Sequence, residues 1–315
     1  MFNTFFDAWS SMTRPEAGAP AQRVSGSRFS HGSHKDGERA LHYRLFIPGG
    51  EHGPMPLIVM LHGCGQDATD FAAGTGMNAL AEEHGCLVLY PEQSCGAHWN
   101  RCWNWYDRTH HRRGEGEPAL IAGLTRRIMA EHGIDPSRVA VAGLSAGGAM
   151  AVIMGRTYPD LFSAVGCHSG LAHGSASSDA GALLAMRTGA GPSAAALPDA
   201  YAAVPVIVFH GDADATVHRT NSASVIRQFL DSHAVHSRAA DAGVAMVAET
   251  GRTGGRAFTR HVHSEPAGGV LAEQWTVHGA GHAWSGGDLR GSYTDARGPN
   301  ASEEMLRFFM GRTEC

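Results

Sequence analysis

The chain has 315 residues, of which 43% are hydrophobic and 17% are charged, and its formal net charge at pH 7 is −5. This composition is typical of a folded globular protein and excludes collagen-like and disordered chains. The negative charge argues against a nucleic-acid partner, and no apolar run approaches the roughly 18 residues of a membrane-spanning helix, so neither nucleic acid nor a membrane is expected as a partner.

The N-terminal segment is rich in Ala, Pro, Ser and Gly and shows no periodicity. It predicts a loosely ordered arm over residues 1–25, followed by a single domain over 26–315. The segment lacks the basic start and the long apolar run of a secretory signal. We therefore expect a cytoplasmic protein, or one whose signal was removed before this numbering begins.

The first part of the domain predicts a β-α-β unit. Residues 41–47 alternate between apolar and polar side chains, as an edge strand does. Residues 57–61 and 86–90 are continuous apolar runs, which favours strands buried on both faces. A helical pattern over 70–84 lies between them and ends at Gly85.

The alternation continues to the end of the chain and predicts an α/β fold with a mostly parallel, doubly wound sheet and helices on both faces. The expected strands are 138–142, 163–167, 206–210 and 272–277, and the expected helices are 118–132, 148–154, 222–230 and 302–310. Residues 170–203, with a possible helix at 180–187, break this rhythm and are expected to form an insertion or lid over the functional edge of the sheet. Residues 251–256 predict a hairpin turn between late antiparallel strands.

The segment Gly143–Gly147 reads G-x-S-x-G and lies between an expected strand and an expected helix. In that context Ser145 would occupy a nucleophile elbow, a sharp turn whose small neighbours let the backbone present the hydroxyl. The pentapeptide alone arises easily by chance in a chain with 41 glycines, but its position makes it specific. It predicts that Ser145 is a catalytic nucleophile.

A serine nucleophile needs a histidine to take its proton and a carboxylate to orient that histidine. Asp212 and Asp214 follow one expected strand, and His278 and His282 follow another. We favour Asp214, because Asp212 lies so close to its strand that a turn role is natural. We favour His282, because the glycines around it make a flexible turn, although spacing alone leaves both pairs open.

The segment Leu61–Gln66, which reads LHGCGQ, follows the expected strand 57–61. In this type of fold that loop supplies one backbone N–H to the developing oxyanion, and the residue after the nucleophile supplies another. The N–H groups of Cys64 and Ala146 are therefore the expected oxyanion hole. An ordinary turn is the alternative.

Five motifs together resemble the polyhydroxybutyrate depolymerase family of α/β-hydrolase esterases, which is similar to feruloyl and acetyl xylan esterases. They are Leu61–Gln66, Cys102–Trp105, Gly143–Gly148, His210–Asp214 and Gly281–Gly287, within a resemblance that covers residues 40–311. The resemblance implies a serine esterase with no cofactor, with its catalytic positions on Ser145, Asp214 and His282, and with a small or oligomeric ester as substrate. The family that the chain resembles also includes secreted members, so an extracellular location stays open.

Depolymerases that attack insoluble polyester outside cells usually append a substrate-binding domain, whereas this chain ends soon after the last expected helix. We therefore expect soluble esters or short hydroxybutyrate oligomers. The alternatives are a feruloyl or acetyl xylan esterase, a thioesterase or peptidase on the same fold, and a non-catalytic binding module. A binding module would normally have lost a member of the triad, and the sequence retains all three. The oligomeric state is not specified.

Loop tryptophans are the candidate substrate contacts. Trp99, Trp103, Trp105 and Trp284 lie in expected loops, where a core role is less automatic than in a strand. Trp103, Trp105 and Trp284 are the expected substrate-binding residues, and plain packing of a long loop is the alternative.

The cysteines and a histidine-rich loop leave further possibilities. Cys86 and Cys167 lie in apolar runs and are expected to be buried thiols. Three loop cysteines leave a disulfide open, with Cys64 to Cys102 as one pairing. His98, His110 and His111 with Asp107 suggest a metal site, but they lack metal-ligand spacing, so we favour a solvated loop and expect no metal.

Overall fold

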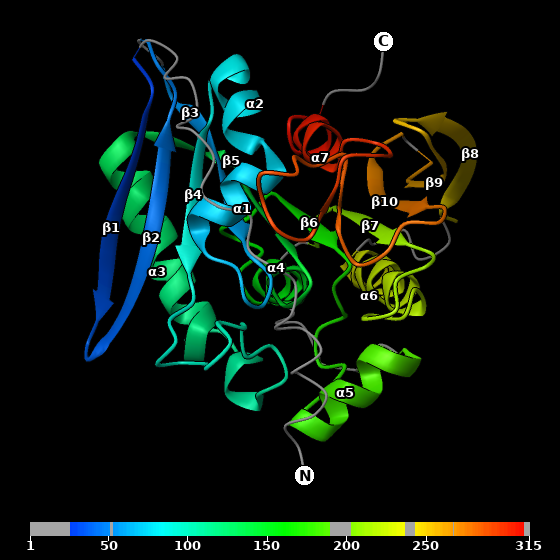
Figure 1. The fold of residues 1–315 in the computed structure, drawn as a ribbon, viewed down its shortest axis with the longest axis horizontal. Coiled ribbons are helices and arrows are strands. Elements are labelled where there is room, and N and C mark those ends of the chain that lie inside the picture. The colour runs from blue at the N-terminus through cyan, green and yellow to red at the C-terminus, as the bar shows by residue number, and fades with distance from the viewer. Residues whose placement is uncertain (1–25, 51–52, 190–202, 237–242, 267, 312–315) are drawn as a thin grey trace.

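The computed structural model describes residues 26–50, 53–189, 203–236, 243–266 and 268–311, and the expected arm at 1–25 lies outside them. In this part of the chain a ten-stranded sheet has the order β1-β2-β4-β3-β5-β6-β7-β10-β9-β8 (Figure 1). The strands are β1 (Arg28–Asp36), β2 (Arg39–Ile47), β3 (Met55–Leu61), β4 (Leu87–Glu92), β5 (Ile134–Leu144), β6 (Ala164–His168), β7 (Val206–Gly211), β8 (Ala245–Thr253), β9 (Arg256–Ser264) and β10 (Val270–Val277). A short pair, β11 (Trp284–Ser285) and β12 (Thr294–Asp295), lies apart from it.

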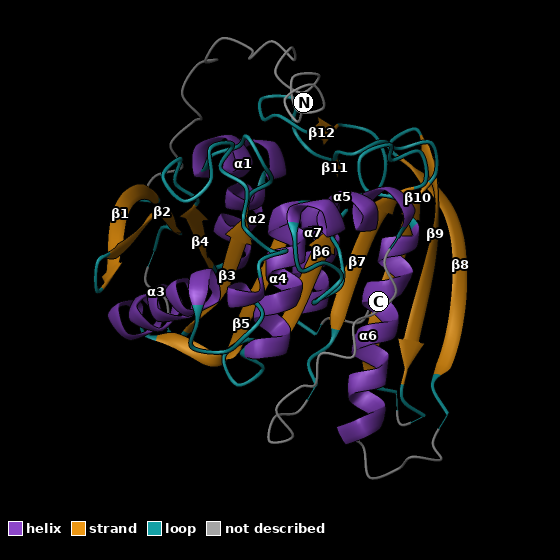
Figure 2. Cartoon of the chain, turned by 90° about the horizontal axis from the view of Figure 1, so that it is seen from below, coloured by secondary structure: helices purple, strands orange, loops and turns teal. Residues whose placement is uncertain are grey.

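Helices cover both faces of this sheet (Figure 2). The helices are α1 (Ala68–Thr75), α2 (Met77–His84), α3 (Gly116–His132), α4 (Ala146–Thr157), α5 (Asp179–Thr188), α6 (Thr220–His236) and α7 (Ala301–Phe309). Helices α3, α4 and α6 pack on one face, and α1, α2 and α7 pack on the other. No helix among the described residues is both long and apolar enough to cross a lipid bilayer.

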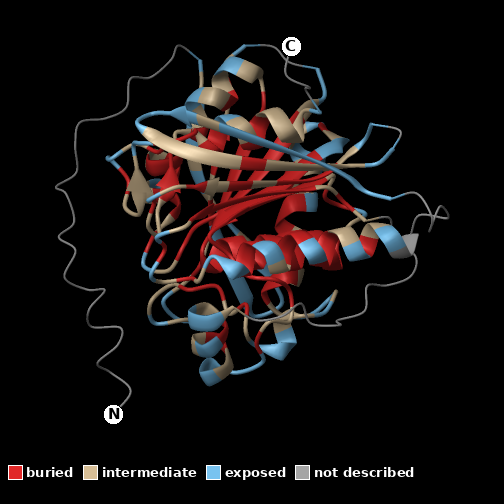
Figure 3. Cartoon of the chain, turned by 90° about the vertical axis from the view of Figure 1, so that its right-hand side faces the viewer, coloured by how far each residue is buried: buried red, intermediate tan, exposed pale blue. Residues whose placement is uncertain are grey.

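The central strands are parallel, which explains their continuous apolar sequences. β4, β3, β5, β6, β7 and β10 run parallel to one another. Because side chains alternate between faces along a strand, Leu57 and Val59 join the core under α3 and α4, while Ile58 and Met60 join the core under α1 and α2. Figure 3 shows the buried positions concentrated in these strands and on the inward sides of the helices. The expected α/β sheet is confirmed.

Two elements at the start of the domain differ from the expectation. Residues 41–47 belong to β2, which is not the edge strand, because β1 pairs with it in antiparallel register. β1 reads RFSHGSHKD and is largely exposed, so its sequence carries little apolar signal. The expected helix over 70–84 is two helices, since Gly76 adopts a left-handed conformation (φ 64°) that ends α1 and precedes α2.

The late antiparallel strands are confirmed. β8 and β9 form a hairpin whose turn is shorter than the expected 251–256, because the pairing runs to Thr253 and Arg256. β10 then pairs antiparallel with β9 and parallel with β7, which makes it the last parallel strand of the sheet. In the expected insertion, α5 covers the whole of the predicted helix at 180–187, and 190–202 lie outside the described residues. A lid role for this segment stays a prediction.

Cys86 and Cys167 are buried free thiols, as expected. Burial raises the pKa of each thiol to about 12, so neither is an available nucleophile near neutral pH. Both residues act as small hydrophobic side chains in the core.

Candidate active site

Ser145 lies at the turn between β5 and α4, at the carboxyl end of a parallel strand. Its backbone has φ 56° and ψ −118°, a conformation that side-chain-bearing residues rarely adopt. The turn is closely packed: a Cβ added to Gly143 would lie 2.4 Å from the carbonyl carbon of Gly147, and one added to Gly147 would lie 2.1 Å from the backbone oxygen of Leu61. Strain of this kind persists where the surroundings enforce it, often at functional sites.

Asp214 lies in the loop after β7, and its side chain is completely buried. One carboxylate oxygen accepts hydrogen bonds from the N–H groups of Thr216 and Val217, at 2.9 and 2.8 Å. The other lies 2.7 Å from Nδ1 of His282, which follows β10. Burial opposes ionisation of Asp214, but the hydrogen bond and the charge of His282 outweigh it and lower the pKa of the carboxyl. An ionised carboxylate can only accept, so Nδ1 of His282 carries the hydrogen.

The other ring nitrogen of His282 is not used in a hydrogen bond within the part of the chain that the structure describes. Nε2 of His282 is buried and has no hydrogen-bond partner among the described residues. His282 and Ser145 line one small pocket together with Gly63, Cys64, Leu144 and Tyr293. The described residues contain no hydrogen bond between Ser145 Oγ and His282 Nε2, and such bonds are often long in the absence of substrate. The arrangement provides a proton acceptor beside a hydroxyl.

The competing residues also form a pair, outside that pocket. Oδ2 of Asp212 lies 2.8 Å from Nδ1 of His278, and Oδ1 accepts a hydrogen bond from the N–H of Gly279. Nε2 of His278 lies 2.9 Å from Oγ1 of Thr259. The His278 side chain is 42% exposed, against 7% for His282. The structure therefore brings Asp214 and His282 to the serine, and it places Asp212 and His278 on the surface.

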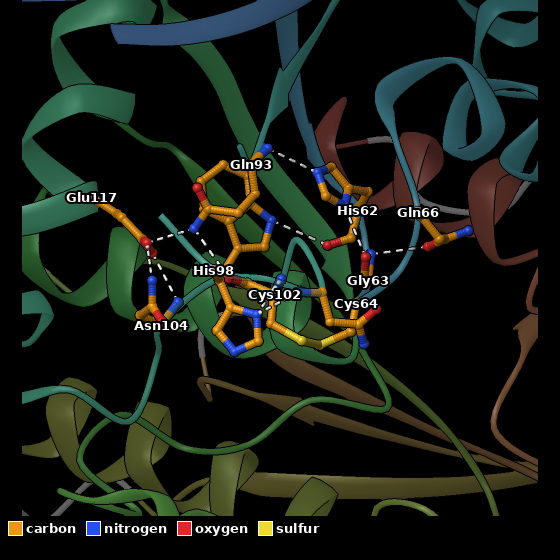
Figure 4. Close-up of a disulfide and its surroundings, with 11 residues drawn as sticks. His62, Gly63, Cys64, Gln66, Gln93, His98, Cys102, Asn104 and Glu117 are labelled. Atoms are coloured by element: carbon orange, nitrogen blue, oxygen red, sulfur yellow. Dashed lines mark hydrogen bonds between the residues drawn. A yellow bond between two sulfur atoms is a disulfide. The ribbon is translucent and has the colours of Figure 1, made fainter. Parts of the chain in front are cut away.

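The expected oxyanion loop follows β3, and Cys64 lines the pocket. Hydrogen bonds fix the preceding peptide: the N–H of Gly63 donates to Oε1 of Gln66 (2.9 Å), and the oxygen of Gly63 lies 2.8 Å from Nδ1 of His62 (Figure 4). Nε2 of His62 accepts from the N–H of Gln93, so Nδ1 is the donor to Gly63. Ala146 is the first residue of α4, where a helix leaves its N–H groups without intrahelical acceptors. Both expected amides thus lie next to Ser145 or in its pocket.

A disulfide joins Cys64 to Cys102, 38 residues apart in sequence, and Figure 4 shows the polar groups around it. The Cys102 backbone is held on both sides, because its N–H donates to Nδ1 of His98 and its oxygen accepts from Nε2 of Gln93. Gln93 also donates to the buried carboxyl of Glu117, whose pKa burial raises. The disulfide therefore ties the oxyanion loop to a buried polar network.

Two buried histidines near the triad were not identified from the sequence. His168 ends β6, and its backbone oxygen accepts from the N–H of Ser145. Its ring stacks on Trp284 and Phe209, and burial, with the nearby His210 and His282, lowers the pKa of His168 to about 3. His210 lies 3.5 Å from Oδ2 of Asp214, and burial lowers its pKa as well. Both lie at or near the ends of apolar strands, and His210 also begins one of the five motifs, but no role was assigned to either.

The structure gives the three expected substrate tryptophans packing roles instead. Trp103 and Trp284 are fully buried and Trp105 is 5% exposed. Nε1 of Trp103 donates to the oxygen of His62, and Nε1 of Trp284 donates to Ser302. The segments that carry them, a loop for Trp103 and Trp105 and the short strand β11 for Trp284, fold inward, which the sequence does not reveal. Trp99, by contrast, is 66% exposed and stacks on His98.

The histidine-rich loop uses its side chains within the protein. Nδ1 of His110 accepts from the N–H of Glu117, His111 bonds the oxygen of Trp105, and Asp107 caps the short helix at 108–110. In the described ranges, no three His, Cys, Asp or Glu side chains gather as metal ligands would.

Comparison with known proteins identifies relatives. A family model described as "Esterase PHB depolymerase" matches residues 41–252. Poly(3-hydroxyalkanoate) depolymerase C of Paucimonas lemoignei is 34% identical over 245 residues, which are 75% of this chain and 56% of that protein. Feruloyl esterase B of Neurospora crassa is 36% identical over 118 residues, 37% of this chain and 39% of that protein. Acetylxylan esterases are among the further relatives.

Among solved structures, the acetyl xylan esterase from Aspergillus awamori aligns with a TM-score of 0.63 at 17% identity, covering 89% of this chain and 99% of that one. This likeness shows a shared α/β-hydrolase fold. The chain spans about half the length of the first curated relatives it matches, 56% of one and 51% of a poly(3-hydroxybutyrate) depolymerase of Ralstonia pickettii.

Proposed function

The chain belongs to the esterase family of PHB depolymerases, as its five motifs predicted, and from this premise we propose that it hydrolyses carboxylic esters through an acyl-enzyme on Ser145. The observation that carries the proposal is His282, which lines one pocket with Ser145. Its Nδ1 is bonded to a buried carboxylate, and its buried Nε2 has no hydrogen-bond partner in the described part of the chain. Asp214 orients this histidine and stabilises its protonated form.

In the first half of the reaction, Nε2 of His282 takes the proton of the Ser145 hydroxyl as Oγ attacks the ester carbonyl carbon. The carbonyl oxygen becomes an oxyanion, which the N–H groups of Cys64 and Ala146 stabilise. The tetrahedral intermediate then expels the alcohol, which leaves with the proton from His282. Ser145 keeps the acyl group as an ester.

In the second half, His282 takes a proton from water, and the resulting hydroxide attacks the acyl-enzyme carbonyl. The same amides hold the second oxyanion. The intermediate collapses to the free acid, and the proton on His282 returns to Ser145 Oγ. One water is consumed, and the enzyme is restored with no cofactor.

For the substrate we propose soluble esters, including short oligomers of hydroxybutyrate. The family and the Paucimonas lemoignei relative support the hydroxyalkanoate class. Feruloylated and acetylated polysaccharides are the second candidate, since feruloyl and acetylxylan esterases are also relatives. Trp103 and Trp284 are fully buried and so offer no exposed aromatic surface that would favour the feruloyl group.

The test uses the full chain with p-nitrophenyl acetate and a serine-directed fluorophosphonate. We expect ester hydrolysis by the wild-type protein and one added phosphonyl mass on the peptide that contains Ser145. Ser145→Ala should lose at least about 10⁴-fold in kcat and take up no label. Near wild-type turnover by this variant would contradict the mechanism.

A second measurement separates the substrate classes. The wild-type protein is compared on hydroxybutyrate dimers and trimers, methyl ferulate and acetylated xylan, each by kcat/KM. We expect the hydroxybutyrate oligomers to give the highest values. A higher kcat/KM for methyl ferulate or acetylated xylan would replace the proposed substrate and leave the triad chemistry unchanged.

A further inference from the structure

Apart from Tyr293, the residues that line the Ser145 pocket belong to the expected oxyanion loop, to the turn at Ser145, or are His282 itself. Tyr293 belongs to a different segment of the chain. It lies after β11, directly before β12, and lines the pocket together with Ser145 and His282. The pocket has a volume of about 10 Å³, roughly the space that one water needs. Any acyl group bound to Ser145 must therefore share this space with Tyr293.

The backbone of Tyr293 is in a conformation that a bulky residue rarely adopts, with φ 53°. Hydrogen bonds fix the preceding residue and the carbonyl of Tyr293 itself. The N–H of Ser292 donates to Oδ1 of Asp70 and its oxygen accepts from Nε2 of Gln66, while the oxygen of Tyr293 accepts from the N–H of Trp284 at 2.7 Å. The surroundings thus impose an unfavourable backbone conformation at the edge of the proposed acyl site, which is the kind of outlier that points to function.

One buried side chain connects this segment to the oxyanion loop. Gln66 is 1% exposed, and its Oε1 accepts from the N–H of Gly63 while its Nε2 donates to the oxygen of Ser292. The positions of the oxyanion loop and of the Tyr293 segment are therefore set by the same amide group. The distance between the two sides of the pocket is fixed by packing rather than left to a mobile loop.

We propose that Tyr293 is a specificity-determining residue that limits the length of the acyl group of the substrate, because a longer chain needs the volume that Tyr293 occupies. This inference rests on the proposed esterase function and deepens it. It assigns the selection of acyl length to one side chain, and it is compatible with a hydroxybutyryl group and with acetyl.

The experiment compares kcat/KM for p-nitrophenyl acetate, butyrate and octanoate. In the wild-type protein the octanoate value should lie at least about 10-fold below the acetate value. Tyr293→Gly, which removes the side chain and suits a positive φ, should raise the octanoate to acetate ratio of kcat/KM at least about 10-fold. Tyr293→Asn provides the same test should the glycine variant fail to fold, since Asn also tolerates this backbone region.

Two controls make the readout specific. Tyr293→Phe keeps the ring and should keep the wild-type ratio, and Trp99→Ala, which removes an exposed aromatic residue outside the pocket, should do the same. An unchanged ratio in a folded Tyr293→Gly or Tyr293→Asn variant would overturn this inference alone. Absence of wild-type activity on all three esters would instead overturn the proposed function.

Discussion

Two Asp–His pairs arise from the same two loops, one facing the serine and one facing the solvent. The inner pair, Asp214 and His282, has a hydrogen-bond distance of 2.7 Å, and the outer pair, Asp212 and His278, has a distance of 2.8 Å. In both pairs the aspartate follows β7 and the histidine follows β10. The hydrogen bond within each pair therefore does not distinguish the inner pair from the outer one. The difference between the two pairs lies in the residues around them.

The surroundings differ in three respects. The inner carboxylate is fully buried and the outer one is 25% exposed. The inner histidine shares a pocket with Ser145 and Cys64, whereas Nε2 of His278 meets the hydroxyl of Thr259. Thr259 lies within the regular strand β9, outside that pocket, although it completes an Asp–His–hydroxyl series. The comparison teaches that the hydrogen bonds of an Asp–His–hydroxyl series do not by themselves identify a site, because only the inner pair shares a pocket with Ser145.

The largest difference should come from replacing each of the two histidines by alanine. His282→Ala removes the proposed proton acceptor and should lower kcat at least about 10⁴-fold. His278→Ala removes the same side chain from the outer pair and should change kcat less than about 10-fold. Steady-state kinetics on p-nitrophenyl acetate, with thermal unfolding of each variant, measures both. Equal losses in the two folded variants would show that the inner pair has no special role.

The aspartates should give the next largest difference. Asp214→Asn leaves the shape of the pair but removes the charge that orients and stabilises His282, so kcat should fall about 10³- to 10⁴-fold. Asp212→Asn should cost less than about 10-fold in kcat and about 1 kcal/mol in the free energy of unfolding, because it weakens contacts between the two loops. A dead Asp212→Asn protein beside an active Asp214→Asn protein would reverse the assignment.

A smaller loss of kcat should follow from breaking the disulfide between Cys64 and Cys102, which holds the expected oxyanion loop beside the inner pair. Cys102→Ser should lower kcat about 10- to 100-fold with little change in KM, because misplaced donors act mainly on the transition state. It should also lower the free energy of unfolding by up to about 4 kcal/mol, as expected for a closed loop of this length. Cys95→Ser, which changes the exposed free cysteine of the same region, is the matched control and should leave kcat near wild type.

The smallest effect concerns the pH dependence of stability around the inner pair. The pKa of His168 is lowered to about 3 in the folded protein, chiefly by burial, whereas in the unfolded chain it returns to about 6.5. Below pH 6.5 the unfolded state therefore binds a proton that the folded state does not, and stability falls as the pH falls toward 3. The slope is at most about 1.4 kcal/mol per pH unit for this proton. The free energy of unfolding is measured with urea between pH 4 and 7. In His168→Gln its slope against pH should be smaller by the amount that corresponds to about one proton, and an unchanged slope would contradict this account.

The parallel sheet and the elbow were predictable because both depend on local sequence. Residues 57–61 and 206–209 are apolar throughout since they are covered on both faces, and the glycines around Ser145 follow from the packing of the turn. β1 was missed for the opposite reason, because an exposed edge strand needs few apolar residues. Patterns reveal an element only where burial constrains it.

The inner and outer pairs show where sequence reasoning stops. Asp212 and Asp214 are two residues apart after the same strand, and their separation in space depends on hydrogen bonds such as that from the N–H of Ala213 to the oxygen of Ala280. The structure brings together the favoured Asp214 and His282, and their catalytic role stays a prediction. The burial of the three tryptophans favours a packing role, which a position outside the expected strands and helices does not reveal, and their role as substrate contacts stays a prediction.

The close packing at the elbow also limits how the sequence can vary. No side chain fits at Gly143 or Gly147 without displacing main-chain atoms of the turn or of β3. Random mutagenesis of this pentapeptide should therefore return glycine at both positions in every active clone, even under selection for a new substrate. The two glycines by which the motif is recognised in a sequence are thus also positions of the site that directed evolution cannot vary.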